Sequence, residues 1–285
     1  MQSSNPVFRR SEGFNGRRTG SASGMSYPSY GSPRTQYDPY SGGGYGTGYQ
    51  TPTRTAQGPM TIDTVVQKTA VTLGLVVLAA GLTWLITPNP DVFGANLGSL
   101  YLLAMVGALG GFALSIVNSF KRVVSPGLVM AYAVLEGVFV GAFSKVLEAS
   151  FGGGIVVGAV AGTAAAVAGT LAAYKFFNIR VSATFQKWVV AAMFGFVGVA
   201  LLDMVLGVFH ASFGFNGFGP MGFIASLIGL GLGVLMLILD FDFVERGIAA
   251  GLPERESWRA AFGLTVTIIW IYVELLRILA ILRGD

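Results

Sequence analysis

Five acidic residues lie inside or at the ends of long apolar stretches of this chain: Glu136, Asp203, Asp240, Asp242 and Glu274. A carboxylate within a membrane-spanning segment is energetically costly, so such residues usually belong to an ion path, a proton relay or a buried ion pair. A low-dielectric environment favours the protonated form of a carboxyl group, and two carboxyls that share a site favour it further. These residue types therefore point to pH-dependent passage of a cation.

Some of these acids have a basic residue at helical spacing. Arg246 follows Asp242 by four residues, and Arg277 follows Glu274 by one turn. Both spacings place the two side chains on one face of a helix. Two purely structural explanations follow. Asp242, Glu245 and Arg246 could form a solvated helix end, and the charge of Glu274 could be neutralised by Arg277.

The other acids are harder to explain as local pairs. Glu136 and Asp240 have no basic residue three or four positions away, so each must find a partner on another helix, bind a cation or stay protonated. Cysteine is absent, which excludes disulfides, thiolate metal sites and cysteine nucleophiles. His210 is the single histidine, and the chain has no G-x-S-x-G motif, P-loop or nucleotide-binding fingerprint. We therefore expect neither an enzyme nor a cofactor.

Composition indicates the elements that position these acids. The chain has 285 residues, of which 53% are hydrophobic and 11% charged, and its mean hydropathy is +0.66. A soluble domain carries about 25% charged residues. After Met60 the sequence contains seven apolar segments, each close to the roughly 20 residues that a membrane-spanning helix needs. An all-α, seven-span membrane protein is predicted, with spans near 65–87, 97–119, 126–147, 153–175, 187–209, 220–241 and 260–282.

Residues 1–58 differ in composition from the rest. They are rich in Gly, Ser, Tyr and Arg and nearly free of Leu, Ile and Val. Such a segment cannot bury enough apolar surface to offset its ordering entropy. We expect a disordered cytoplasmic tail before a transmembrane domain over 60–285.

Basic residues predict the orientation of the spans. Of the 18 Lys and Arg residues, seven lie before the first span or at its start, and two lie between the second and third spans. Three more lie between the fourth and fifth spans, and three between the sixth and seventh. With seven spans, all of these fall on one side, which the positive-inside rule assigns to the cytoplasm. The formal charge of +4 thus fits membrane topology better than nucleic-acid binding.

Three stretches carry a family resemblance. They read YAVLEGVFVGAFS over 132–144, LDFDFVERG over 239–247 and TIIWIYVELLR over 267–277. In this order they resemble the Bax inhibitor-1 family (transmembrane Bax inhibitor motif proteins), in the branch found in actinobacteria. The resemblance covers roughly residues 60–282, together with the opening NPVF and GFN stretches.

The resemblance implies a seven-helix fold with the last helix near the centre of the bundle, and a pH-sensitive calcium leak. In better-studied members, two aspartates on the last two helices share a proton and latch the pore. Asp240 matches the first of these aspartates. The position of the second falls on or near Thr267, which cannot ionise. Glu274, two turns along the same helical face, and Glu136, on another helix, are the candidates to replace it.

The expected function is thus a passive, pH-sensitive cation (calcium) leak or channel in the plasma membrane, gated by Asp240 with Glu136, Glu274 and Asp242. The alternative is a non-conducting regulator that binds other membrane proteins, such as a membrane protease or a stress-response partner. Its carboxylates would then be buried structural pairs.

The predicted orientation can be tested directly. Reporter domains fused after Arg18 and after Asp285 should report opposite sides of the membrane, with the first in the cytoplasm, because seven spans separate them. Two fusions on the same side would show that the number of spans is even.

Overall fold

The structure, a computed structural model, describes residues 58–89 and 97–284. The residues in these two ranges form seven α-helices, and all seven are long and apolar enough to span a membrane. The predicted all-α, seven-span fold is therefore confirmed, whereas the predicted disordered tail lies outside the described residues except for Gly58. The helices are α1 (Ile62–Ile86), α2 (Leu97–Phe120), α3 (Pro126–Phe151), α4 (Ile155–Phe176), α5 (Ala183–Val208), α6 (Pro220–Ala249) and α7 (Glu256–Gly284).

Several helices extend beyond their apolar stretch. The helix α6 continues to Ala249, where the prediction ended it at residue 241, so the acidic stretch after Asp240 is helical. The helix α5 begins four residues before the predicted start, where the side chain of Ser182 accepts a hydrogen bond from the backbone of Phe185. Hydropathy marks only the part of a helix that lies in hydrocarbon, so it misses polar turns at the ends.

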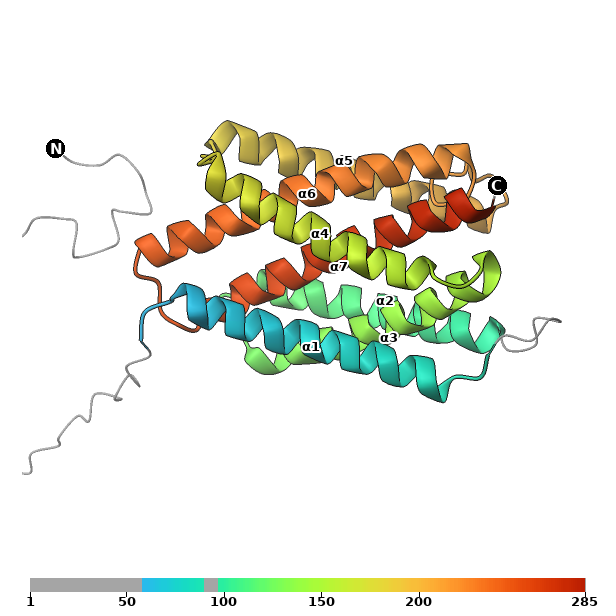
Figure 1. Cartoon of the computed structure of the whole chain (residues 1–285), viewed down its shortest axis with the longest axis horizontal. Coiled ribbons are helices and arrows are strands. Elements are labelled where there is room, and N and C mark those ends of the chain that lie inside the picture. The colour runs from blue at the N-terminus through green and yellow to red at the C-terminus, as the bar shows by residue number, and fades with distance from the viewer. Residues whose placement is uncertain (1–57, 90–96, 285) are drawn as a thin grey trace, which may run out of the picture. The chain divides into compact units, whose positions relative to one another are not determined.

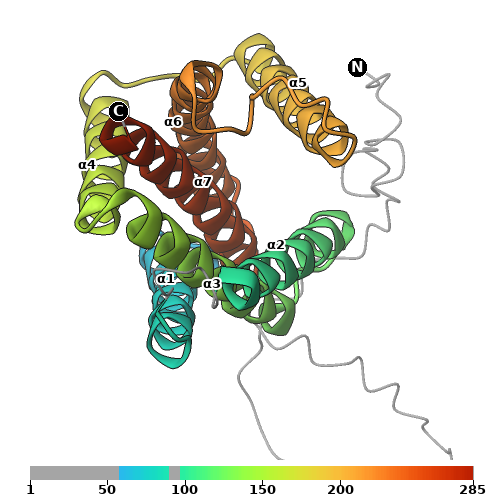
Figure 2. The same cartoon turned by 90° about the vertical axis from the view of Figure 1, so that its right-hand side faces the viewer.

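The last helix occupies the centre of the bundle, as the family resemblance implied. Figure 2 shows α7 surrounded by α1, α3, α4 and α6, with α2 against α3 and α5 beside α6. Two-thirds of the most apolar window of α7 is buried (67%), against 11% for α5. Groups carried by α7 are therefore the best shielded in the bundle.

Hydroxyl groups attach α7 to its neighbours. Thr72 of α1 lies 2.8 Å from Thr265, and Ser144 of α3 lies 2.7 Å from the phenol of Tyr272. These side chains are buried, and a buried hydroxyl without a partner would be costly. The pairs therefore fix the position of α7 against α1 and α3 as well as satisfying each other.

The glycine motif of α3 faces α1. A Cβ placed on Gly137 or Gly141 would lie 2.5 Å from a backbone carbonyl of α1, that of Val76 or Ala80. Only glycine allows the two backbones to approach so closely, and a small-xxx-small spacing of this kind is common where membrane helices touch.

A buried lysine terminates α1. Lys145 of α3 is only 4% exposed, and its ammonium donates hydrogen bonds to the carbonyls of Trp84 (2.7 Å) and Thr87 (2.5 Å). These carbonyls lie at the end of α1, where no backbone donor follows and where the helix dipole favours a positive charge. Lys145 thus satisfies the last turn of α1 from a neighbouring helix.

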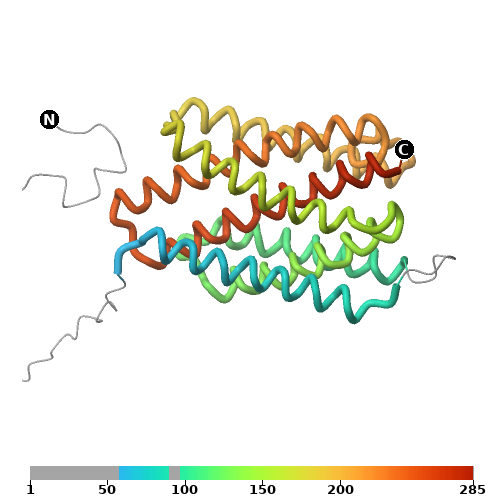
Figure 3. The backbone as a smooth tube through the Cα atoms, viewed as in Figure 1, coloured from blue at the N-terminus to red at the C-terminus, as the bar shows by residue number. Residues whose placement is uncertain are grey.

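The helices run alternately up and down. The start of α1 and the connection between α6 and α7 therefore lie at one end of the bundle, and the end of α7 lies at the other (Figures 1 and 3). At the first end Met60 donates to the carbonyl of Leu252 and Glu254 donates to that of Gly58. Three basic side chains, one from the start of α1 and two from the connection into α7 and its first turn, meet here: Lys68 binds Glu254, and Arg255 and Arg259 donate to carbonyls of the α2–α3 connection.

Candidate functional site

The contact between α6 and α7 brings Asp240 to Thr267. The hydroxyl of Thr267 donates a hydrogen bond of 2.6 Å to Oδ2 of Asp240. The other carboxylate oxygen faces Gly263, one turn earlier on α7, where a Cβ would lie 3.3 Å from it. The two positions that the family resemblance pairs are thus in contact, although one of them carries a hydroxyl and not a second acid.

This substitution changes the chemistry of the pair. Two carboxyls can share one proton, whereas a threonine hydroxyl stays neutral at any physiological pH. The carboxyl group of Asp240 therefore has a neutral donor as its partner. Its side chain is half-buried and Thr267 is buried, so the carboxylate combines limited access to water with a single side-chain hydrogen bond.

A second polar site lies farther along α7. Oε2 of Glu274 lies 3.3 Å from Nη1 of Arg277, and both side chains are at most 10% exposed. Glu274 is seven residues after Thr267, which corresponds to about 10 Å along the helix axis. Its other oxygen faces α6 at Gly229, where a Cβ would lie only 2.6 Å away. Glu274 is therefore held between its own helix and α6, and it does not pair with Asp240.

The connection between α5 and α6 completes this second site. Arg277 donates through Nη2 to the carbonyls of Phe215 (3.0 Å) and Gly217 (3.4 Å). The guanidinium is thus surrounded by one carboxylate oxygen and two backbone oxygens, the type of ligand that calcium prefers.

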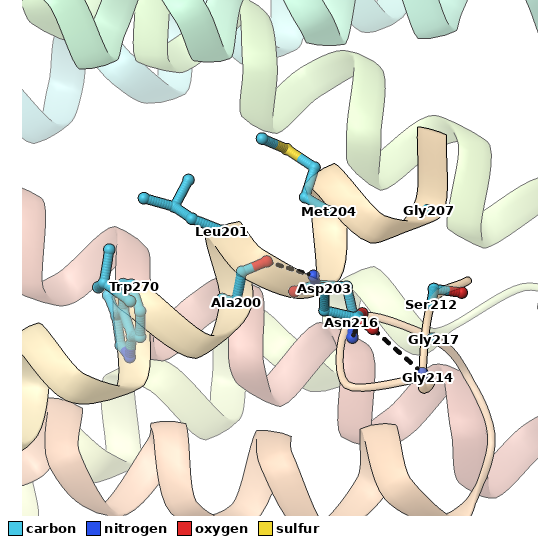
Figure 4. Close-up of a pocket in the computed structure, with 11 residues that line it drawn as sticks. Ala200, Leu201, Asp203, Met204, Gly207, Ser212, Gly214, Asn216, Gly217 and Trp270 are labelled. Carbon is cyan, nitrogen blue, oxygen red and sulfur yellow. Dashed lines mark hydrogen bonds between the residues drawn. The ribbon is translucent and has the colours of Figure 1, made fainter. Parts of the chain in front are cut away.

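Asp203 positions that connection. Its carboxylate is 2% exposed and accepts hydrogen bonds from the backbone amides of Phe213 (2.8 Å), Gly214 (3.2 Å) and Asn216 (2.8 Å). The side-chain amide of Asn216 donates through Nδ2 to the carbonyl of Ala200 on α5 (2.7 Å). Figure 4 shows Ala200, Asp203, Gly214 and Asn216 of this group beside a cavity, which has a volume of about 540 Å³ and lies near the C-terminal end of α5. Asp203 therefore acts on Arg277 through the loop that it organises.

An apolar contact separates the two polar sites. Between them on α7, Trp270 and Ile271 pack against Gly233 of α6, where a Cβ would lie 2.8 Å from the Ile271 side chain. The indole of Trp270 donates to the carbonyl of Gly229 (2.9 Å). Along the interface of α6 and α7, the acid Asp240, a tight apolar contact and the ion pair of Glu274 and Arg277 thus follow one another.

Glu136 lies at a different interface. It is half-buried on α3 and its carboxylate faces α2 at Gly111, where a Cβ would collide with Oε2. Among the described residues, Glu136 forms no ion pair. The structure therefore places Glu136 among α2 and α3 side chains, away from the contact between Asp240 and Thr267.

The acidic end of α6 forms its own cluster. Asp242 is buried and pairs with Arg246 one turn later. Glu245 accepts a hydrogen bond of 2.6 Å from the phenol of Tyr174 at the end of α4. These contacts join α4 to α6 and distinguish Asp242 from Asp240, although only one residue separates them.

Two features of the structure were not predicted from the sequence, the buried Lys145 and the backbone carbonyls that bind Arg277. Lys145 is a charged residue within the third span, and that position alone marks it as a residue that needs a partner. The carbonyls of Phe215 and Gly217 carry no side-chain signal, so no sequence pattern could have assigned them to Arg277. In the described part of the chain, no three His, Asp or Glu side chains gather into a group that could hold a metal ion.

Fold and site together define a multi-pass α-helical membrane protein with acids buried between its last helices. The sequence matches the family described as "Bax inhibitor 1 like" over residues 5–284, and the chain belongs to that family. It is also 32% identical over 162 residues to an uncharacterized protein of Chlamydia muridarum (strain MoPn / Nigg). That match covers 54% of this chain and 64% of the relative, so it spans less than two-thirds of the relative's length.

The ion pair on α7 gives a stability prediction. Glu274→Gln should lower the free energy of unfolding by roughly 3–5 kcal/mol, because it leaves Arg277 charged and buried without its acid. Replacing both residues together, Glu274→Leu with Arg277→Met, should cost less than the single change, since no unpaired charge remains. Unfolding of the purified protein in detergent measures both effects.

The matched control is the pair of Glu256 and Arg259, which has the same spacing at the start of α7 and is more exposed, with side chains 22% and 37% exposed. Glu256→Gln should cost at most about 1 kcal/mol. A loss at Glu274 no larger than that at Glu256 would contradict a buried, structurally important pair.

Proposed function

We propose that this protein is a passive, pH-sensitive cation leak of the cell membrane, with calcium as the transported ion. The observation that carries the proposal is the environment of Asp240. This acid lies within a membrane-spanning helix, has a threonine hydroxyl as its side-chain partner and has no ion-pair partner among the described residues. Such a carboxyl can bind either a proton or a passing cation, which is the exchange that a pH-gated path requires.

The second polar site supports a closed conformation of this path. Arg277 places a tethered positive charge among oxygens of Glu274, Phe215 and Gly217 that would otherwise suit a cation. The packing of Trp270 and Ile271 against Gly233 separates that site from Asp240. Conduction along α6 and α7 would require this packing to loosen and Arg277 to move from its oxygen ligands.

The proposed orientation puts Asp240 near the cytoplasmic side and Arg277 near the external side. Its support is the end of the bundle where Lys68, Arg255 and Arg259 meet, since positive residues favour the cytoplasm. Calcium would then leave the external oxygens and pass Asp240 last on its way inward. The proposal describes transport, with no enzymatic step.

A second candidate is a non-conducting regulator that binds a membrane protease or a stress-response partner. The favouring observation is that Glu274, Asp203 and Asp242 are all engaged in ion pairs or backbone hydrogen bonds, as structural acids would be. The two candidate functions differ in the role of Asp240, which binds a cation or a proton in the leak and has no transport role in the regulator.

Calcium flux into liposomes across a pH series tests the proposal. Flux through the unaltered protein should rise as the pH rises through the titration of Asp240, because only the ionised carboxylate binds a cation. Asp240→Asn cannot ionise, so its flux should stay low and nearly independent of pH while the protein remains folded.

Asp63→Asn is the matched control, because Asp63 is exposed at the start of α1 and its charge lies outside the path. This variant should keep the pH response. A full pH response in Asp240→Asn would exclude Asp240 as the titrating group, and no flux from the unaltered protein at any pH would favour the regulator.

A further inference from the structure

A long apolar groove separates α1 from α4. Its volume is about 760 Å³, and its floor is formed by α3 and α7. The two wall helices both pack on α7, yet α1 and α4 make no contact with each other over the residues that the structure describes. Small residues line both walls, including Gly81 on α1 and Ala164 and Ala168 on α4.

The small residues have an unusual role here. In membrane proteins, small side chains normally let two helices touch, as Gly137 and Gly141 do where α3 meets α1. Across the groove, Gly81 has no neighbour within 4 Å of an added Cβ. The small residues of the two walls therefore create space, and that space opens toward the hydrocarbon around the helices.

The dimensions favour a narrow, extended occupant. The lining runs from Leu73 to Trp84 on α1, which is about 16 Å of helix. This length is close to one leaflet, since the whole hydrocarbon core is about 30 Å thick. A helix about 10 Å wide would need roughly 1,300 Å³ over the same length, which exceeds the groove.

An acyl chain fits the same space. A methylene occupies about as much room as a water molecule, roughly 30 Å³, so a chain of 16 carbons needs about 480 Å³. The groove can hold one such chain along its whole length. It is too small to enclose a whole transmembrane helix of a partner protein, which could insert only one face.

Along most of its length the groove offers a ligand no free polar side chain, and the indole N–H of Trp84 lies at one end. Ser144 and Tyr272 hydrogen-bond to each other at the floor, and the hydroxyl of Thr163 donates to the carbonyl of Ala159 on its own helix (2.7 Å). An occupant therefore needs no donors or acceptors along its length, which describes a hydrocarbon chain.

The end of the groove at the C-terminus of α1, which is the outer end in the proposed orientation, has a different character. Trp84 lines it there, and the ammonium of Lys145 lies 5.8 Å from the centre of the Trp84 ring. Tryptophan gathers at the level of lipid headgroups. A chain in the groove would thus have its headgroup beside Trp84, close to the positive charge of Lys145.

From these observations we infer that the groove between α1 and α4 is a binding site for a single acyl chain of a phospholipid from the outer leaflet. The site meets α7 through Ile268, Ile269 and Tyr272, whereas Asp240 contacts α7 through Thr267. The lipid site is therefore separate from the proposed cation path. The bound acyl chain fills the space between α1 and α4, which do not touch each other.

Photolabelling of the full chain in liposomes tests this inference. The liposomes contain phosphatidylglycerol with a diazirine on one acyl chain, and mass spectrometry of peptides locates the adducts after irradiation. Labelling of the groove-lining stretch of α4 should exceed labelling around Phe194, which is 75% exposed on α5, by about threefold or more, because a pocket holds its ligand longer than an open surface.

Two variants fill the groove from opposite walls, Ala164→Phe and Gly81→Leu. Each should reduce the excess labelling of α4 to the level at Phe194. Ala165→Phe, at the adjacent exposed position outside the lining, should preserve it. Circular dichroism and gel filtration check that all three variants are folded.

Equal labelling of the groove and of α5 in the unaltered protein would overturn the inference, and so would full labelling in folded Ala164→Phe. Groove residues that cross-link to another protein chain and not to lipid would show that a protein occupies this face.

Discussion

Every polar side chain within a lipid bilayer must find its partner inside the protein, and in this bundle most of those partners meet on α7. This helix binds α1 and α3 through hydroxyl pairs at Thr265 and Tyr272, and it meets α6 through Thr267 and Glu274. Because the surrounding hydrocarbon offers no alternative donors or acceptors, these contacts fix the rotation of α7. The placement of Asp240 and Glu274, on opposite sides of an apolar contact, follows from that rotation.

The same constraint links parts of the chain that are distant in sequence. Asp203 binds three backbone amides of the α5–α6 connection, that connection supplies two carbonyls to Arg277, and Arg277 neutralises Glu274. The helix α5 has little other contact with the bundle: it packs on α6, and its Phe196 ring lies against Trp270 of α7. A change at the outer end of α5 would therefore reach the centre of the bundle through hydrogen bonds of one short loop.

Much of this architecture could be predicted from sequence, because hydropathy and spacing are local signals. The seven spans follow from apolar length, because each apolar stretch is about as long as the hydrocarbon core is thick. The partners of isolated polar residues are not local. Nothing near Asp240 in the sequence indicates Thr267, which came from the family resemblance, and nothing near Lys145 indicates the end of α1. Glu136 shows the limit most clearly, since only the structure places it against α2.

The central claim is that Asp240 changes its protonation state within the membrane. Infrared difference spectroscopy between acidic and alkaline pH detects that change directly, because a protonated carboxyl and a carboxylate absorb separately. The unaltered protein in liposomes should show a protonated carboxyl band that disappears over the same pH range in which calcium flux rises. That band should be missing from Asp240→Asn and present in Asp63→Asn. An unchanged spectrum in Asp240→Asn would contradict the claim, because the titrating carboxyl would then belong to another residue.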